Sequence, residues 1–165
     1  MNYRRLLASL ILAITLFLSP MQAQAASSSS ITRSMGDSEF QAKDFSGQDL
    51  MGTEYTNVNL EKANFNHANL RGVVFNGSVL QGVNLHGVDF SEGIAYLVDF
   101  KGANLSDAVL TDAMMLRSSF TDVDITGADF TNAVLDGIQV KKLCAKASGV
   151  NSKTGVDTRE SLGCK

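Results

Sequence analysis

The chain has 165 residues, of which 44% are hydrophobic and 19% charged, and its formal net charge at pH 7 is −3. This length corresponds to about one domain. Residues 36–140 carry 15 acidic and 5 basic side chains, which argues against nucleic acid as a partner of this region because phosphate contacts need clustered Lys and Arg. Residues 141–165 hold 6 basic and 2 acidic side chains, spread out as in a solvated end.

Residues 1–25 have the features of a secretory signal peptide. Two arginines precede the apolar run 6–18, and Ala23-Gln24-Ala25 forms an A-x-A site. We expect cleavage between Ala25 and Ala26 and export of a mature chain with 12 basic and 17 acidic residues. The alternative is a membrane anchor, but the run is short for a span and no basic stop-transfer cluster follows it. The arginine pair fits both the general secretory route and twin-arginine export.

After a serine-rich polar tether and N-terminal cap over residues 26–39, every fifth residue from 40 to 140 is apolar, and 16 of these 21 residues are Leu or Phe. A period of five would smear an apolar set around a helix and would place successive apolar residues on opposite faces of a flat strand. Only a chain that turns after every repeat points all of them inward. The sequence therefore predicts an all-β solenoid.

Two other positions of the repeat support this fold. Of the 20 residues at positions 47, 52 and so on to 142, nine are Gly and five are Asn or Asp, the residues that accept a positive φ in a type II turn. All 18 residues at positions 53, 58 and so on to 138 are small or β-branched, as expected of a second inward layer. Lys43 and Gln48 interrupt that inward layer, so we expect a frayed first coil or an N-terminal cap there.

The repeat resembles the A-(D/N)-L-x-x pattern of the pentapeptide-repeat family, for example in Ala63-Asn64-Phe65 and Ala128-Asp129-Phe130. The resemblance covers about 100 residues. It implies a right-handed quadrilateral parallel β-helix with four repeats per coil, in which residue n stacks on residue n+20.

The sequence carries no pattern typical of an enzyme, a cofactor site or a metal site. His67 and His86 would lie on neighbouring coils with Asp107 nearby, but two corner histidines lack the closed ligand set of a structural metal site. General acid and base catalysis needs paired carboxyls in a cleft, which a convex rod does not offer. We therefore expect no catalytic, cofactor-binding or metal-binding residue and no small-molecule substrate.

An apolar stripe interrupts the polar surface of the predicted rod. The residue before each centre is expected to face solvent and is usually Asp or Asn in the family that the repeat resembles, but on one side it is apolar in four successive coils. Tyr96, Leu97 and Leu116 fall beside this stripe. We call these residues the ridge: Val74, Ile94, Tyr96, Leu97, Met114, Leu116 and Val134. Such a surface is typical of interaction sites, so it either binds a partner protein or is covered by a terminal segment of the chain itself.

The five-residue period stops after residue 140, and residues 141–165 predict a cap of two short helices. The first would end near Gly149, and Asp157 with Glu160 forms a capping box that begins the second. In an exported protein, Cys144 and Cys164 predict a disulfide that closes about 20 residues. The bond is either a structural staple or a redox-switchable link.

Residues 143–164 resemble the tail of the thylakoid-lumen pentapeptide-repeat proteins of cyanobacteria and chloroplasts. This resemblance implies a location in the thylakoid lumen or periplasm, a cysteine-bonded pair of helices and an association with the photosynthetic membrane. The single short signal favours a cyanobacterial source.

We therefore predict a non-catalytic protein-binding or scaffold protein with partners in the lumen or at the lumenal membrane face, and no transmembrane segment in the mature chain. A redox-responsive regulator acting through Cys144 and Cys164 is the alternative. A DNA mimic that modulates topoisomerases is a remote one, opposed by the signal peptide and by the apolar ridge.

Overall fold

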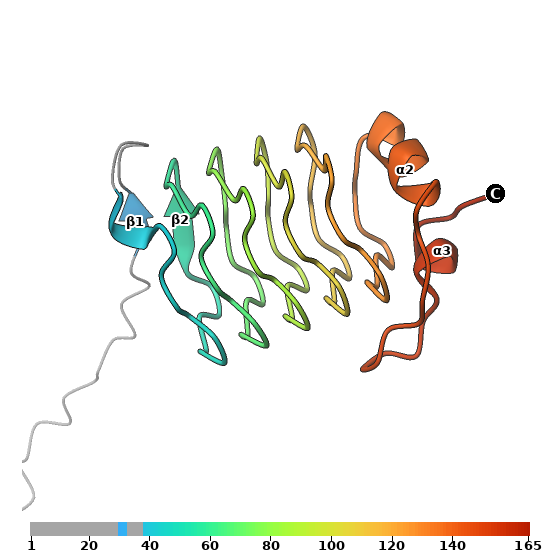
Figure 1. Ribbon diagram of the computed structural model, residues 1–165, viewed down its shortest axis with the longest axis horizontal. Helices are drawn as coiled ribbons and strands as arrows, with labels where there is room; N and C mark the ends of the chain where they lie inside the picture. The colour runs from blue at the N-terminus through green and yellow to red at the C-terminus, as the bar shows by residue number, and fades with distance from the viewer. Residues whose placement is uncertain (1–29, 33–37) are drawn as a thin grey trace, which may run out of the picture.

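The computed structural model describes residues 30–32 and 38–165 and shows a rod of stacked coils with helices at its C-terminal end (Figure 1). Strand β1 (Ser30–Thr32) lies parallel to β2 (Glu54–Thr56) at the N-terminal end, with Ser30 opposite Glu54. The short helix η1 (Ser38–Phe40) leads into the coils. Helices α2 (Gly137–Cys144) and α3 (Thr158–Ser161) follow the last coil. The predicted signal peptide and its cleavage site at Ala25 and Ala26 lie outside the described residues.

Each coil contains 20 residues, which confirms the predicted β-helix with four repeats per coil. Isolated parallel bridges join residues 20 apart along the whole rod, for example Asp44 to Asn64 and Asn64 to Asn84. The backbone N–H of Phe45 donates to the carbonyl of Asn64 at 2.7 Å, and the N–H of Asn64 donates back to Lys43 at 2.8 Å. Backbone polar groups are thus paired between coils, as parallel strands require.

The residues that form these bridges define four columns along the rod. We number them in chain order: the first column is Asp44, Asn64, Asn84, Asn104 and Asp124; the second is Asp49, Asn69, Asp89, Val109 and Asp129; the third is Glu54, Val74, Ile94, Met114 and Val134; and the fourth is Asn59, Val79, Asp99 and Ser119.

A residue with positive φ closes every turn from Ala42 to Asn132. Glycine occupies some of these positions, but eleven non-glycine residues adopt the same left-handed conformation, including Leu97 (φ 58°) and Arg117 (φ 57°). A left-handed conformation disfavours a bulky side chain. The ladders above and below each turn therefore impose its geometry even where the local sequence opposes it.

The centre residues fill the rod and are almost completely buried, as Phe65, Leu70 and Phe100 illustrate. The N-terminal end differs, because Lys43 and Gln48 are exposed rather than inward-facing. The Lys43 ammonium lies 5.2 Å from the Phe40 ring centroid and 5.4 Å from that of Phe45, so its stem covers aromatic surface at the end of the rod.

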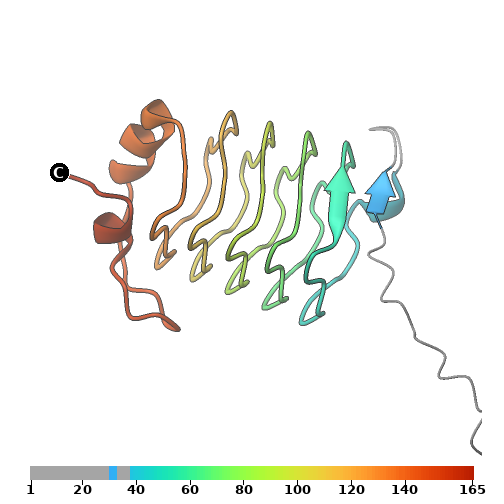
Figure 2. The same ribbon diagram turned by 180° about the vertical axis from the view of Figure 1, so that it is seen from behind.

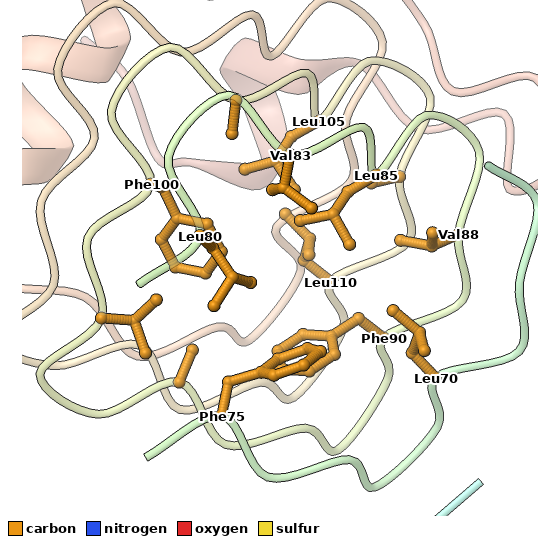
Figure 3. Packing of buried hydrophobic residues seen from close by; sticks show 14 of the residues in the cluster. Leu70, Phe75, Leu80, Val83, Leu85, Val88, Phe90, Phe100, Leu105 and Leu110 are labelled. Atoms are coloured by element: carbon orange, nitrogen blue, oxygen red, sulfur yellow. The ribbon is translucent and has the colours of Figure 1, made fainter. Parts of the chain in front are cut away.

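The core has one irregularity in the repeats around Phe75 and Phe90, whose rings are drawn in Figure 3. Ala95, one coil after Phe75, is the one small centre residue, and Phe75 stacks instead on the Phe90 ring of the repeat before Ala95, at 5.7 Å. Gly93 makes room for that ring, since a Cβ atom there would lie 2.4 Å from Phe90 Cζ. The cavity that remains is only about 10 Å³, at the lower limit of what one water needs.

The repeat ends earlier than the sequence suggests. Helix α2 begins at Gly137, within the region assigned to repeats up to residue 140, and the last parallel bridge between coils joins Met114 to Val134. Asp136 precedes the helix but does not cap it with its side chain. Its carboxylate instead accepts a hydrogen bond from the N–H of Arg117 at 2.6 Å.

The helices α2 and α3 pack against the last coil (Figure 2). Leu143 of α2 is fully buried, and Leu162, directly after α3, is nearly so. Asp157 begins α3 by accepting hydrogen bonds from the N–H groups of Arg159 and Glu160. Cys144 and Cys164 are joined by a disulfide, with their Cα atoms 5.5 Å apart.

Candidate docking surface

The third column places its four apolar residues in register on one side of the rod. Bridges join Val74 to Ile94, Ile94 to Met114, and Met114 to Val134. Met114 is 42% exposed and Val134 50%, while Val74 and Ile94 are half-buried. The rod therefore displays a continuous apolar row on this side, across four successive coils.

The turns between the third and fourth columns carry the remaining ridge residues. Tyr96 and Leu116 are half-buried, and Leu97 is 53% exposed. The Arg117 guanidinium lies 5.7 Å from the Tyr96 ring centroid, within the range of a cation–π contact. The seven predicted ridge residues thus fall on one column and the turns that border it.

Sequence reasoning missed one exposed apolar residue close to the ridge in sequence. Ile138 falls where the repeat predicts a small inward side chain, yet it is 65% exposed because α2 replaces the expected repeat at that point. The local sequence gives no signal of this, because Gly137, the residue before Ile138, is also the residue type that the turns of the repeat favour.

The Asp and Asn residues of the other columns make a hydrogen bond to the backbone that the apolar residues of the ridge cannot make. The carboxylate of Asp44 accepts from the N–H of Ser46 at 3.0 Å, and that of Asp124 accepts from the N–H of Thr126 at 2.9 Å. These backbone hydrogen bonds lower the pKa of both Asp44 and Asp124. In each such repeat, the Asp or Asn side chain satisfies the backbone N–H two residues further along the chain.

Val74, Ile94 and Met114 have no oxygen with which to accept this bond. Among residues 30–32 and 38–165, no group accepts a hydrogen bond from the backbone N–H groups two residues after them, which are those of Asn76, Tyr96 and Leu116. The apolar column is therefore bordered by a parallel column of unpaired N–H donors.

Acidic groups flank the ridge. Glu92 forms an ion pair with Arg71 at 2.5 Å in the turns that precede the third column, and the exposed Asp112 follows one coil later. Glu54 begins the column itself and accepts a hydrogen bond from the Thr56 hydroxyl at 2.9 Å. Arg71 and Glu92 neutralise each other, and the Arg117 guanidinium lies over Tyr96, so the surroundings of the ridge combine the acidic groups Glu54 and Asp112 with one cation on the ridge itself.

The described C-terminal tail lies elsewhere on the rod. The Asn151 amide donates to the carbonyls of Asp107, Ala108 and Gly127, and the Lys153 ammonium donates to the carbonyl of Gly87. Gly87, Asp107 and Gly127 form the corner between the first and second columns. The described tail thus leaves the third column uncovered; the terminal segment before residue 30 lies outside the described residues.

The two histidines lie near each other at the same corner. Their ring centroids are 5.1 Å apart; His67 leans over Gly87, and His86 Nδ1 is 2.8 Å from the Ser106 hydroxyl. Within the part of the chain that the structure describes, no three His, Cys, Asp or Glu side chains gather as they would around a metal ion. A search of that same part also finds no helix with the length and hydropathy of a membrane span.

Comparison with known proteins agrees with this architecture. The family model described as "Pentapeptide repeats" matches residues 56–92 and 98–137 in eight copies. A crystal structure of a pentapeptide repeat protein from the thylakoid lumen of Arabidopsis thaliana is 39% identical and aligns over 76% of this chain and 88% of that one, with a TM-score of 0.68.

Two curated Arabidopsis thaliana proteins match shorter stretches. The thylakoid lumenal protein TL20.3 is 60% identical over 40 residues, and the thylakoid lumenal 15 kDa protein 1 is 48% identical over 48. These stretches cover 24% and 29% of this chain but only 14% and 21% of the relatives' own lengths. All three relatives are named as proteins of the thylakoid lumen, which confirms the predicted exported location. The chain belongs to the pentapeptide-repeat family.

Proposed function

We propose that the protein is a non-catalytic scaffold of the thylakoid lumen that binds another protein through the ridge. The observation that supports this proposal is the apolar third column on an otherwise acidic rod. Exposed apolar surface that continues over several coils is costly in water and is typical of interaction sites. We propose in addition that the protein associates with complexes of the photosynthetic membrane.

The rigidity of the rod suits it to this role. Every coil is tied to the next by backbone hydrogen bonds, so the ridge residues keep their spacing without a partner. A preformed surface loses little conformational entropy on binding. The named location of the relatives supports a partner in the lumen or at the lumenal face of the membrane.

The test compares Met114→Asp with the matched control Ser119→Asp. Both residues occupy the same position in adjacent repeats, in the third and fourth columns, and neither faces the core. Each variant, purified in the folded, disulfide-bonded form, is used to capture partners from solubilised thylakoid membranes. We expect Met114→Asp to lose the proteins that the wild-type chain captures, and Ser119→Asp to retain them. Identical capture by all three proteins would refute the ridge as the docking surface.

A redox-responsive regulator remains the second candidate, favoured by the position of the disulfide. The bond joins α2 to the tail that follows α3, and the segment between its cysteines holds Asn151 and Lys153 against three coils. Reduction would free this segment at its C-terminal end. The reduction potential of the disulfide distinguishes a redox-responsive bond from a structural one, since a value below about −300 mV would identify a purely structural bond.

A further inference from the structure

The occupant of the ridge can be inferred from the hydrogen-bonding groups that border it. We propose that the ridge binds an apolar peptide segment in the polyproline II conformation, with basic residues beside it, running along the axis of the rod. This inference rests on the proposed docking function and adds the conformation and chemistry of the partner.

Unpaired N–H donors indicate a partner that brings carbonyl acceptors. Where the column residue is Asp or Asn, its oxygen meets the corresponding N–H at 2.9–3.4 Å, for example in the Asp49 and Asp124 repeats. The N–H groups that follow Val79, Val109 and Ser119 lack this bond within the described residues as well, so the donors indicate a partner only where an apolar row lies beside them. The N–H groups of Asn76, Tyr96 and Leu116 lack such an oxygen within the described part of the chain. A polyproline II segment has unpaired carbonyls because it forms no internal hydrogen bonds.

The spacing of the donors favours polyproline II over a β-strand. Stacked coils are about 4.8 Å apart, so the donors of Asn76 and Leu116, two coils apart, are separated by about 9.6 Å. Carbonyls on one side of a polyproline II helix recur about every 9.3 Å, after three residues. Carbonyls along one edge of a β-strand recur roughly every 6.8 Å, which matches neither donors on adjacent coils nor donors two coils apart.

The apolar row of the ridge also suits a polyproline II segment. Proline-rich segments bind aromatic and apolar surfaces through their rings and aliphatic side chains. Tyr96 lies between the two donors, and Ile94 and Met114 form the row next to it. The acidic groups Glu54 and Asp112 near the row provide charge complementarity to basic residues at the ends of the segment, whereas Arg117, which lies over Tyr96, favours an uncharged middle.

The size of the surface argues against a second copy of this chain. Four residues stacked at about 4.8 Å, on a side of roughly 10 Å, offer on the order of 200 Å². A stable dimer buries about 800 Å² on each partner. A short peptide segment is the occupant whose dimensions fit.

The test uses a short synthetic peptide of alternating proline and valine with lysines at both ends, added to the full ¹⁵N-labelled mature protein. We expect it to shift the amide signals of Asn76 and Leu116 and to bind more weakly as salt increases. A peptide with serine in place of proline should bind several-fold more weakly, because it pays a larger ordering entropy. Equal binding of the two peptides, or binding that leaves both amides unshifted, would overturn the inference, as would the absence of binding.

Proline substitutions isolate the donors from the apolar row. Asn76 and Leu116 precede positive-φ residues, a position where proline fits a type II turn, so Asn76→Pro with Leu116→Pro removes both N–H groups while keeping the turns. Because Leu116 is itself a ridge residue, Leu116→Ala, which retains the N–H, is the control for the loss of its side chain. We expect peptide affinity to fall about tenfold, as for two lost hydrogen bonds. Thr121→Pro is the matched control: its N–H is likewise unpaired within residues 30–32 and 38–165, but it lies off the ridge. Unchanged affinity in the double variant refutes the role of the donors.

The two proposals fail in different ways. If Met114→Asp abolishes capture from membranes but the proline peptide does not bind, the docking function stands and this inference is wrong. If capture does not depend on Met114, the proposed function is wrong.

Discussion

Replacing Gly93 by alanine tests how the core accommodates Ala95. A Cβ atom at Gly93 would lie 2.4, 2.5 and 2.6 Å from three atoms of the Phe90 ring. Ordinary carbon contacts are about 3.5–4.0 Å, so the ring would have to withdraw by about 1 Å. Phe75 stacks on the ring, and the adjoining cavity of about 10 Å³ is too small to receive it. We therefore expect Gly93→Ala to lower the free energy of unfolding by about 1–3 kcal/mol, as for other overpacked cores.

The assay is urea denaturation of the oxidised protein, combined with a double-mutant cycle. Phe90→Leu shortens the ring side chain and leaves a cavity, so it should destabilise on its own. Combined with Gly93→Ala, it should cost at least about 1 kcal/mol less than the sum of the two single changes, because the shorter side chain leaves room for the methyl group. Gly137→Ala is the control, since an added Cβ meets no atom within 4 Å at the start of α2 and should be neutral or stabilising. Wild-type stability of Gly93→Ala, or strict additivity with Phe90→Leu, would refute this account.

Three further changes have expected outcomes. Replacing both Cys144 and Cys164 by serine should lower the free energy of unfolding by about 3 kcal/mol, measured with urea, because the bond closes a loop of 20 residues. An unchanged free energy would mean that the disulfide restricts the unfolded chain little. Thr158→Val should raise the melting temperature, because the buried Thr158 hydroxyl has no hydrogen-bond partner among the described residues; a lower melting temperature would show that the hydroxyl is bonded, for instance to water. Burial raises the pKa of Tyr55 to about 12, so the folded chain holds this proton more tightly than the unfolded one, and stability should fall as the pH rises from about 10 to about 12. Spectrophotometric titration of the tyrosines checks this, and a Tyr55 that ionises near pH 10 would contradict it.

The repetition of the sequence explains why so much of the fold could be predicted. A period of five forces a turn after each repeat, and the centre residues can then point only inward, as Phe65 and Phe100 do. Replacement of Asp or Asn by Val74, Ile94, Met114 and Val134 was visible for the same reason. Residues that recur at a regular interval occupy the same environment in each coil, because each repeat is packed against nearly identical neighbours.

Where the repeat is interrupted, only the tertiary structure decides. The Phe90 ring stacks on Phe75 and lies against Gly93, contacts between repeats that the residue types of a single repeat do not predict. Ile138 is exposed although its position in the period predicts an inward side chain, because no further coil is available to pair with it and helix formation satisfies the backbone instead. Leu97 adopts a left-handed conformation against its own preference, since the ladders on both sides require a turn there.

The candidate docking surface likewise has features that follow from the sequence and features that only the folded chain shows. The residues that form the apolar row could be predicted from the sequence, because residues 20 apart lie above one another in successive coils. The place where the described C-terminal tail docks, at the corner of Gly87 and Gly127 rather than on the row, is visible only in the folded chain, as is the absence of any other acceptor among the described residues for the N–H groups beside the row. Both depend on where individual donors and acceptors meet in space, and hydrogen-bond geometry of that kind is not encoded in the period of a repeat.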